Sequence, residues 1–320
     1  MKIDSPETMM AHHGKSFYFA SQVFSKKVFI RISYLYAFCR FVDDTADEQS
    51  ADLALKDLNE ITEILTSKSN TLTGAKIRTS NKFSEPSKPV VNTSLQISIS
   101  DLVLKLDNFG VKKEHLNVLV NGALFDVTGQ IIKTKKDLIR YCYHVAGVVG
   151  LMMCPLILVR QKKAYAFAID LGIGMQLTNI CRDILEDAKN KRLYLPEQDL
   201  NPLNLDVTTL AHQGLSPENL KLVVKKYLDV ADLYYKSSFL GLAYIPFRPR
   251  LAILFASDIY RSIGTKIRKN NYEVLYGRTY LSTLEKVIVS VKSVIKIFHI
   301  RFWFAGYHNV SLHTDIEDLI

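Results

Sequence analysis

The sequence predicts an all-α protein, and two observations favour this fold class over the others. Apolar residues recur at steps of three and four along most of the chain, which is the spacing of an amphipathic helix. No segment shows a convincing strand-like alternation of apolar and polar residues, and no hairpin dipeptide lies between two alternating runs. The long helices and the absence of a βαβ rhythm exclude an α/β fold. We expect helices over residues 17–47, 51–66, 99–110, 113–126, 135–158, 162–187, 216–241 and 248–271.

We expect these helices to form a single domain over residues 1–320, although a chain of 320 residues is also long enough for two domains. Residues 66–94 are rich in Ser, Thr, Asn and Lys, and this composition predicts a flexible surface loop. The helical rhythm resumes directly after this loop, and acidic motifs lie on both sides of it. We therefore interpret it as an insertion rather than a linker. The tail after about residue 300 has no assigned role.

Composition limits the class of protein. The chain is 48% hydrophobic and 23% charged, as globular proteins are. Its four cysteines are scattered, without a CxxC pair or a His/Cys cluster, so we expect neither a zinc site nor a disulfide framework. This cysteine usage fits a reducing, cytoplasmic location, and the first residues lack the apolar core of a signal peptide.

The net charge of +9 favours binding to an anionic partner, which could be a nucleic acid, an anionic membrane surface or a polyanionic ligand such as a diphosphate. The basic residues are spread along the chain without a zinc-finger, RNA-recognition or basic-heptad signature, so we expect no binding to nucleic acid. Residues 287–304 come closest to a membrane span, but Lys292, Lys296 and Arg301 interrupt them. Two interpretations stay open for this segment: a helix packed in the fold, or an amphipathic helix on a membrane surface.

The segment RFVDDTADEQ (40–49) places Asp43, Asp44, Asp47 and Glu48 directly after an apolar run. On a helix, the first and third of these acids are i,i+4 neighbours, and so are the second and fourth. Like charges at this spacing destabilise a helix by roughly 0.2–0.5 kcal/mol per pair. Either water screens the cluster at a helix end, or a cation neutralises it.

A second line of polar residues lies in GMQLTNICRDILEDAKNKRLYLP (174–196). On a helix, Gln176, Asn179, Asp183 and Asp187 fall at i, i+3, i+7 and i+11, which is a single face. The neighbouring leucines and isoleucines would bury this helix, and buried amide and carboxylate groups are destabilising unless they have partners. We therefore expect a partner for this face.

Both segments contain the pattern D-x-x-x-D, which points two carboxylates in one direction. Oxygen ligands without a nearby His or Cys suit Mg²⁺, or alternatively Mn²⁺. One such run alone is typical of a solvated helix end. Two runs, each with an adjacent arginine (Arg40 and Arg182), favour two facing helices that bind a diphosphate through bridging metal ions, with the arginines on the phosphates.

At these motifs the sequence resembles the squalene/phytoene synthases, the head-to-head prenyl synthases of the class I terpenoid synthase fold, and it looks most like the bacterial phytoene synthases. The resemblance covers roughly residues 12–290. It implies a helical bundle around a deep apolar cavity, with the two aspartate helices at its mouth. The motifs that carry it, in chain order, are HHGKSFYFAS (12–21), YLYAFCRFVDDTADE (34–48), YCYHVAGVVG (141–150), QLTNICRDILEDAKNKRLYLP (176–196) and RPRLAILFASDIYRSIG…NYEVLYGRTYLSTLEK (248–286).

The resemblance also implies roles for particular residues. Those that match metal ligands are Asp43 and Asp47 on one wall and Asn179, Asp183 and Asp187 on the other. Those that match contacts to the prenyl diphosphates are His13, Lys15, Ser16, Tyr36, Arg40, Gln176, Arg182, Tyr260 and Arg278, while Phe17 matches an aromatic lining the cavity. Tyr141 matches a tyrosine near the reacting carbons, so the expected catalytic groups are Tyr141, the four aspartates, Arg40 and Arg182. Asp126 lies on an apolar stretch, and whether it is a further functional acid stays open.

The reaction that the resemblance implies is the Mg²⁺-dependent 1-1′ condensation of two allylic diphosphates through a cyclopropylcarbinyl diphosphate. Two C20 units would give phytoene, which is the product that we predict. Two C15 units would instead give presqualene diphosphate, dehydrosqualene or, with NADPH, squalene. The length of the substrate and the oligomeric state stay open at this point.

An alternative of another class is a non-catalytic, membrane-associated protein that retains the fold. Intact aspartates in both motifs argue against it, because a binding-only protein has no need for both metal sites. A C30 or C40 hydrocarbon product must be handled at a membrane. We therefore expect a cytoplasmic protein with peripheral contact at the inner face of the membrane.

Overall fold

The computed structural model describes residues 6–13, 15–67 and 98–320, without the side chains of residues 11–17. Every regular element in these ranges is a helix, so the predicted all-α class is confirmed. The first half of the chain forms α1 (Pro6–His13), α2 (Lys15–Ser21), α3 (Lys26–Glu48), α4 (Ala51–Thr66), α5 (Ile99–Asn108), α6 (Lys113–Val127), α7 (Lys135–Cys142), the π-helix η1 (Tyr143–Gly147) and α8 (Val148–Leu156). The second half forms α9 (Ala164–Lys189), α10 (Glu197–Leu200), α11 (Val207–Leu210), α12 (Glu218–Leu240), α13 (Phe247–Lys269), α14 (Thr283–Val294), α15 (Ile300–Trp303) and the 3₁₀ helices η2 (Asn201–Leu203), η3 (Leu242–Tyr244), η4 (Ile295–Phe298) and η5 (Val310–Leu319).

Two predicted segments differ from the observed helices. The helix expected over residues 17–47 is broken at residues 22–25, where Ser25 caps the start of α3 by accepting a hydrogen bond from the backbone of Val28. The segment 287–304 is divided among α14, η4 and α15. The loop expected over residues 66–94 falls almost wholly outside the described residues, so it stays a prediction, as does the single-domain organisation.

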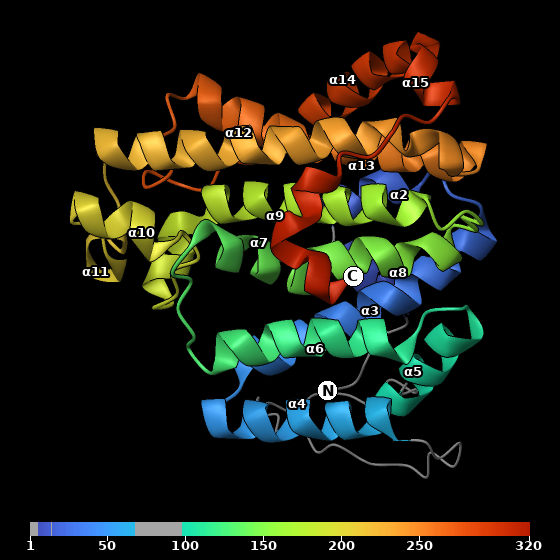
Figure 1. Ribbon diagram of the computed structural model, residues 1–320, viewed down its shortest axis with the longest axis horizontal. Coiled ribbons are helices and arrows are strands. Elements are labelled where there is room, and N and C mark those ends of the chain that lie inside the picture. The colour runs from blue at the N-terminus through green and yellow to red at the C-terminus, as the bar shows by residue number, and fades with distance from the viewer. Residues whose placement is uncertain (1–5, 14, 68–97) are drawn as a thin grey trace, which may run out of the picture.

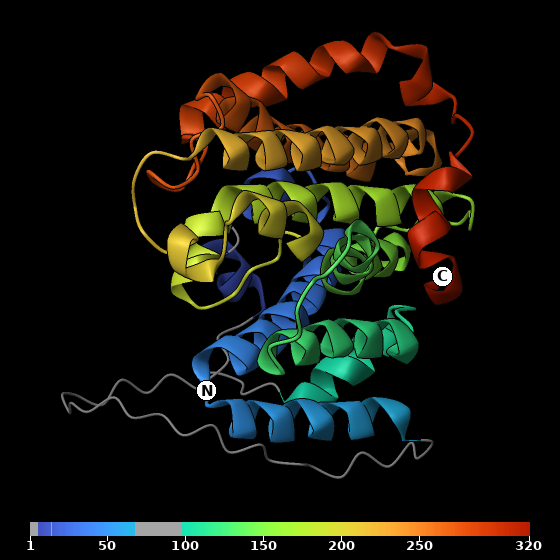
Figure 2. The ribbon, with the colours of Figure 1, turned by 60° about the vertical axis from the view of Figure 1, so that its left-hand side comes forward.

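Helix α9 occupies the centre of the bundle (Figure 1). It packs against α12 and α13 on one side and against α8 and η1 on the other, and Figure 2 shows the same layers from a second direction. Helix α3 packs against α4, α5, α6 and α8, so it carries its acidic end into the same bundle as α9. The amphipathic spacing of these helices places their apolar faces inward.

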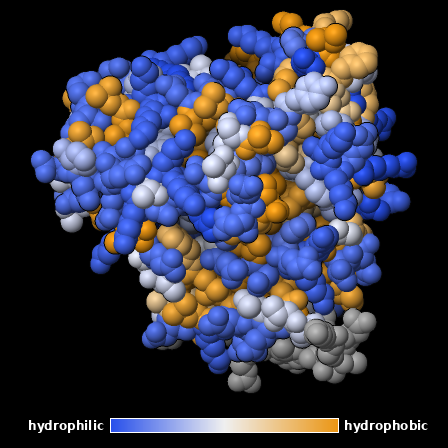
Figure 3. Space-filling view, viewed as in Figure 1, coloured by the Kyte–Doolittle hydropathy of each residue, from blue (hydrophilic) through white to orange (hydrophobic). Residues whose placement is uncertain are grey.

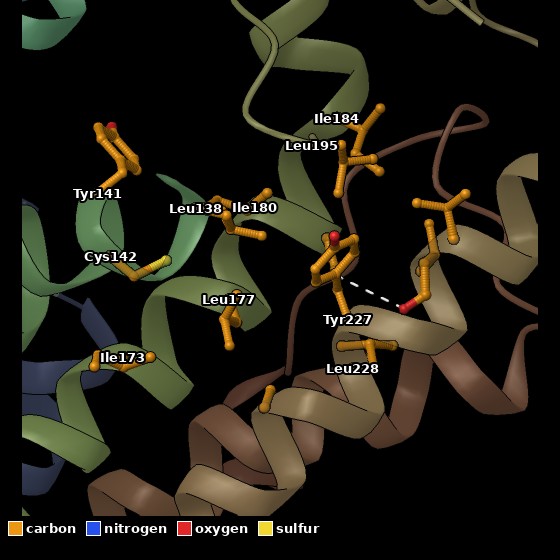
Figure 4. Packing of buried hydrophobic residues seen from close by; sticks show 14 of the residues in the cluster. Leu138, Tyr141, Cys142, Ile173, Leu177, Ile180, Ile184, Leu195, Tyr227 and Leu228 are labelled. Atoms are coloured by element: carbon orange, nitrogen blue, oxygen red, sulfur yellow. Dashed lines mark hydrogen bonds between the residues drawn. The ribbon is translucent and has the colours of Figure 1, made fainter. Parts of the chain in front are cut away.

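Two apolar clusters hold the layers together. One is formed mainly by α3, α4, α5, α6 and α8, and the other by α7, α9, α12 and α13. In Figure 4, Leu177 and Ile180 of α9 lie between Cys142 of α7 and Tyr227 of α12. Leu171 of α9 packs against both clusters, so the two are continuous through this helix.

Helices α7, η1 and α8 form one continuous helix, Lys135–Leu156, which is long and apolar enough to cross a membrane by those two criteria alone. However, 61% of its most apolar window is buried inside the protein, and it packs against α6 and α9 as a core helix does. Its π-helical turn is of a kind that often occurs at functional sites.

The C-terminal segment (305–320), to which the sequence assigned no role, returns across the bundle and is red in Figures 1 and 2. Arg140 of α7 donates two hydrogen bonds, of 2.6 and 2.9 Å, to the carboxylate of Asp318. The hydroxyl of Tyr143 in η1 donates to the carbonyl oxygen of Leu319 at 3.0 Å. The segment is therefore fastened to the continuous helix at its end.

Glycines set the spacing between α9 and this continuous helix. A Cβ atom on Gly172 of α9 would lie 2.1 Å from the carbonyl oxygen of Ala146 in η1. A Cβ atom on Gly150 of α8 would lie 2.0 Å from the carbonyl oxygen of Ala168. Because real contacts are never that short, only glycine permits this approach of the two backbones.

We predict that Gly172→Ala lowers the free energy of unfolding by roughly 1–3 kcal/mol, because two packed backbones must separate to admit the methyl group. Urea unfolding followed by circular dichroism measures this change. Gly214→Ala is the matched control, since a Cβ atom there meets nothing within 4 Å. Equal losses of stability in the two variants would contradict the close approach of α9 and η1.

Candidate active site

The last turns of α3 and α9 bring the two predicted acidic segments to one end of the bundle. Asp43 and Asp47 lie near the end of α3, while Asp187 lies near the end of α9. Arg192, just beyond α9, donates a hydrogen bond of 2.5 Å to Oδ1 of Asp47 and ties the two helix ends together. The sequence analysis did not single out Arg192, although it stands in the basic run directly after the second acidic segment.

A cavity of ≈ 270 Å³ lies between α3 and α9, with α6 and α7 completing its walls. Because its residues come from five elements (α3, α6, α7, η1 and α9), the pattern along the chain does not by itself group them. The residues singled out from the sequence that line this cavity are Tyr36, Arg40, Asp43, Asp126, Tyr141 and Gln176.

A second cavity, of ≈ 240 Å³, adjoins the first, and both are lined by Val145 and Gln176. The lining of the second cavity is almost wholly aliphatic and aromatic, with Asn179 and Tyr260 among its few polar members. It reaches Leu242 of η3. An apolar cavity with polar groups at one place suits a ligand that has a polar head and an apolar chain.

Burial and mutual repulsion raise the pKa of two of the carboxyls. The pKa of Asp43 rises to about 6, first because surrounding protein atoms displace part of the water around this carboxyl, although its side chain is 60% exposed, and then because of the neighbouring charge of Asp47. The pKa of Asp187 rises to about 7, through burial and then through Asp183 and Glu186. Negative charge at these two positions is therefore poorly neutralised by the surrounding side chains.

Arginines approach the other acids of the site. Arg40 lies 2.5 Å from Oδ1 of Asp44, and Arg182 donates two hydrogen bonds, of 2.8 and 2.5 Å, to Asp183. Arg278, far along the chain, approaches the same Asp183 at 2.9 Å. The three arginines that were predicted to contact phosphates thus lie directly at the acidic groups, where they are within reach of an anion bridged to those acids.

The donor set on α9 fits a divalent cation. Oδ1 of Asn179 is buried, and no group in the described part of the chain donates a hydrogen bond to it. A buried acceptor without a partner is destabilising, and a bound ligand that pairs with this oxygen would remove the destabilisation. Asn179 shares its helix face with Asp183 and Asp187, so three oxygen-bearing side chains stand in one row, which is the ligand type that Mg²⁺ and Mn²⁺ prefer.

Asp126 of α6 holds two tyrosines at the rim of the cavity. Its carboxylate accepts hydrogen bonds from the hydroxyl of Tyr141 at 3.0 Å and from that of Tyr194 at 2.9 Å. The two rings stack with their centroids 4.8 Å apart. Burial raises the pKa of Asp126 to about 6, although both hydrogen bonds act to lower it. Tyr194 was missed from the sequence, where only its place in RLYLP after the acidic helix pointed to it.

The side chains of His13, Lys15, Ser16 and Phe17 lie outside the described residues, so the roles predicted for them stay untested. The roles of the other site residues also stay predictions, because the geometry brings these residues together without showing what they bind. The predicted residues that line the two adjoining cavities are Tyr36, Arg40, Asp43, Asp126, Tyr141, Gln176, Asn179 and Tyr260. The other predicted acids and arginines, Asp47, Asp183, Asp187, Arg182 and Arg278, lie at the two helix ends without lining either cavity.

Comparison with known proteins identifies the family of the chain. Residues 10–285 match the family model described as squalene/phytoene synthase. The chain belongs to this family. It is therefore a prenyltransferase, and membership implies chemistry on prenyl diphosphates that depends on a divalent metal.

The relatives divide between two product names. The 15-cis-phytoene synthase of Enterobacter agglomerans is 33% identical over 288 residues, which are 87% of this chain and 90% of that protein. The 4,4′-diapophytoene synthase of Staphylococcus haemolyticus is 26% identical over 279 residues, or 87% of this chain and 91% of that one. A crystal structure of a dehydrosqualene synthase in complex with ligand superposes with a TM-score of 0.74 at 27% identity, covering 91% of this chain and 95% of that one. The predicted isoprenoid synthase fold is thus confirmed.

We predict that Asp126→Asn gains stability relative to the parent as the pH rises from 5 to 8. The pKa of Asp126 is raised in the folded state, so the folded protein binds more protons than the unfolded one between about pH 4 and pH 6, and stability falls as the pH rises through that window. An amide does not titrate, so the relative gain between the two pH values should be roughly 1–2 kcal/mol, whatever the loss of one hydrogen-bond acceptor does to the variant at both. Urea unfolding at the two pH values measures it, and a gain that is the same at both would contradict the raised pKa.

Proposed function

We propose that the chain condenses two molecules of geranylgeranyl diphosphate head to head to form phytoene, through prephytoene diphosphate and with release of diphosphate. The observation that carries this proposal is the junction of the two cavities at Val145 and Gln176. A diphosphate would lie among the acids and arginines on one side of the junction, and its prenyl chain would lie in the apolar cavity on the other. The relatives named phytoene synthase support the C20 substrate.

A divalent cation would be held at the facing ends of α3 and α9. When bound, it supplies electrostatic stabilisation to the charge that develops on the departing diphosphate. The guanidinium groups now paired with the acids would turn to the phosphate oxygens, which they can bind with two parallel hydrogen bonds. The residues that would hold Mg²⁺ or Mn²⁺ are Asp43, Asp47, Asn179, Asp183 and Asp187, and those that would bind the diphosphates are Arg40, Arg182 and Arg278.

The rest of the site would protect and orient the allylic cation. The apolar cavity would exclude water, which otherwise captures such a cation. The face of Tyr141 offers negative potential to cationic carbon, and its ring is fixed by the stacked Tyr194. Asp126 anchors both hydroxyls, so we assign it the role of positioning these rings.

A C15 enzyme that makes dehydrosqualene, presqualene diphosphate or squalene is the second candidate. It is favoured by the likeness to the dehydrosqualene synthase structure and to the diapophytoene synthase. NADPH would be needed only for squalene. A non-catalytic protein is a third candidate, and the row of Asn179, Asp183 and Asp187 argues against it, because a protein that only binds does not need a complete metal site.

We predict that the purified protein converts geranylgeranyl diphosphate to a C40 hydrocarbon in the presence of Mg²⁺ and without NADPH. Extraction followed by mass spectrometry identifies the product. A C30 product from farnesyl diphosphate, with none from the C20 substrate, would contradict the phytoene assignment and select the second candidate. Asp183→Asn should reduce the rate by at least about 100-fold. The control Asp107→Asn changes an exposed carboxylate at the end of α5 and should keep the parent rate.

We also propose that the protein contacts the inner face of the cytoplasmic membrane, since its product is an insoluble hydrocarbon. Large apolar side chains are exposed along α14, η4 and α15, and their colour marks the upper right of Figure 3. We call this the α14–α15 surface and define it by Val291, Ile295, Phe298, Trp303 and Phe304.

Two further observations support lipid as the occupant of the α14–α15 surface. The exposed cations Lys292 and Arg301 lie among its apolar residues, which is a pattern suited to anionic headgroups. Helix α15 packs against η3, whose Leu242 lines the apolar cavity. The surface and the apolar cavity therefore adjoin the same element, η3.

We predict that the protein co-sediments with vesicles that contain anionic lipid and much less with neutral vesicles. The double variant Phe298→Ser/Phe304→Ser should lose most of this binding, because these side chains are 87% and 67% exposed and would enter the headgroup region. Leu222→Ser is the matched control, since Leu222 is 68% exposed on α12, outside the surface. Concentration-dependent dimerisation that the double variant abolishes, without vesicle binding, would assign the surface to a second copy of the chain.

A further inference from the structure

Three metal-binding side chains meet outside the site described above. Asp170 lies on α9, and the C-terminal segment supplies His308 and His313. Nε2 of His313 is 2.8 Å from Oδ1 of Asp170, and Nε2 of His308 is 2.9 Å from Oδ2. Both imidazoles thus direct a ring nitrogen at one carboxylate. Because more than 130 residues separate the aspartate from the histidines, the sequence does not reveal this cluster.

The carboxylate of Asp170 has no permanent positive charge beside it in the described part of the chain. It is fully buried, and its contacts are the two imidazoles and the hydroxyl of Ser237, which donates at 2.5 Å. The hydrogen-bond partners of this carboxylate are thus two imidazoles and a hydroxyl, none of which carries a permanent positive charge. A buried charge is destabilising unless an opposite charge accompanies it, so the cluster calls for a cation.

The donor set selects the kind of cation. Two imidazole nitrogens and one carboxylate oxygen are typical ligands of Zn²⁺, whereas Mg²⁺ prefers oxygen alone. On a tetrahedral zinc ion with bonds of about 2.0 Å, ligand atoms are about 3.3 Å apart. The two imidazoles approach different oxygens of the carboxylate, at 2.8 and 2.9 Å, and the ligand atoms of the three residues all lie within 4.8 Å of one another, so side-chain rotations would have to bring them to the tetrahedral spacing. The side chain of His308 is 14% exposed, so the ion can reach the cluster from solvent and a water molecule can serve as its fourth ligand.

We propose that Asp170, His308 and His313 bind a Zn²⁺ ion that fastens the C-terminal segment to α9. This site is separate from the cation site at the acidic helix ends. Asp183 is thirteen residues farther along α9, which at 1.5 Å per residue is about 20 Å. The zinc ion neutralises the buried carboxylate and replaces the direct contacts of the two imidazoles with bonds to the metal.

The position of the cluster gives the ion a structural role behind the apolar cavity. The ring of His308 contacts the edge of Phe167, with the centroids 5.2 Å apart. Phe167 and Leu171, which flank Asp170 on α9, both line the apolar cavity. An ion at Asp170 would therefore hold the outer side of the helical turn whose inner side forms the cavity wall.

The test measures metal content rather than activity. Full-length protein without a histidine tag is incubated with ZnSO₄, dialysed against buffer that contains Mg²⁺, and analysed for zinc by mass spectrometry. We expect about one Zn²⁺ per chain in the parent and almost none in His308→Ala, His313→Ala or Asp170→Asn. His212→Ala, which changes an exposed histidine elsewhere, should keep its zinc. Asp183→Asn should keep it too, because it alters only the other cation site.

Two further readouts keep the proposal testable if a variant folds poorly. Co²⁺ in place of zinc should give the strong visible absorption of a tetrahedral nitrogen and oxygen site in the parent, and His308→Gln should abolish it while retaining a hydrogen-bonding side chain. A zinc chelator should lower the melting temperature of the parent by roughly 5 °C and leave that of His308→Gln unchanged. Parent protein that binds no zinc, with a melting temperature indifferent to chelator, would overturn the proposal and leave a protonated histidine as the counter-ion of Asp170.

Discussion

Repulsion among the carboxylates within the last turns of α3, and likewise within those of α9, is the constraint on which the rest of the site depends. Both helices pack their apolar lengths into the bundle, so their acidic last turns lie at one end of it, where Asp43 lines the first cavity with its side chain 60% exposed. The pKa values of Asp43 and Asp187 are raised, which means that the charged form of each carboxyl is destabilised in the folded protein. Arginines reduce the repulsion, and the buried oxygen of Asn179 accepts no hydrogen bond from the described part of the chain, which is consistent with the proposed cation. In the proposed function, these carboxylates would bind the divalent cations and, through them, a diphosphate.

Helix α9 links this electrostatic arrangement to the fold. One face carries the polar row, while the rest of the helix packs against α8, α12 and α13. Glycine permits close contact with η1, and η1 places Val145 where the acidic and apolar cavities meet. At its N-terminal end the helix holds the C-terminal segment through Asp170. A change anywhere along α9 is therefore transmitted to the cavity by packing.

Much of the candidate site could be predicted from the sequence, because the spacing of residues along a helix determines which side chains point from the same face. The i,i+4 aspartates and the row from Gln176 to Asp187 needed no knowledge of tertiary structure. Arg192 and Tyr194 were missed because they follow the helix, in a segment without periodicity, and their partners Asp47 and Asp126 lie far away in sequence. The histidines of the C-terminal segment were missed for the same reason, and the break before α3 was hidden by an apolar pattern that continues across it.

The central claim is that the acids of α3 and α9 form one cation site rather than two solvated helix ends. Electron paramagnetic resonance of Mn²⁺, titrated in the presence of inorganic pyrophosphate, tests it most directly, because it counts bound ions without requiring turnover. If one site spans both helices, Asp47→Asn on α3 and Asp187→Asn on α9 should each weaken Mn²⁺ binding by about tenfold or more, and the double variant should lose less than the sum of the two. Binding that is unchanged in either single variant, or losses that are strictly additive, would contradict a shared site.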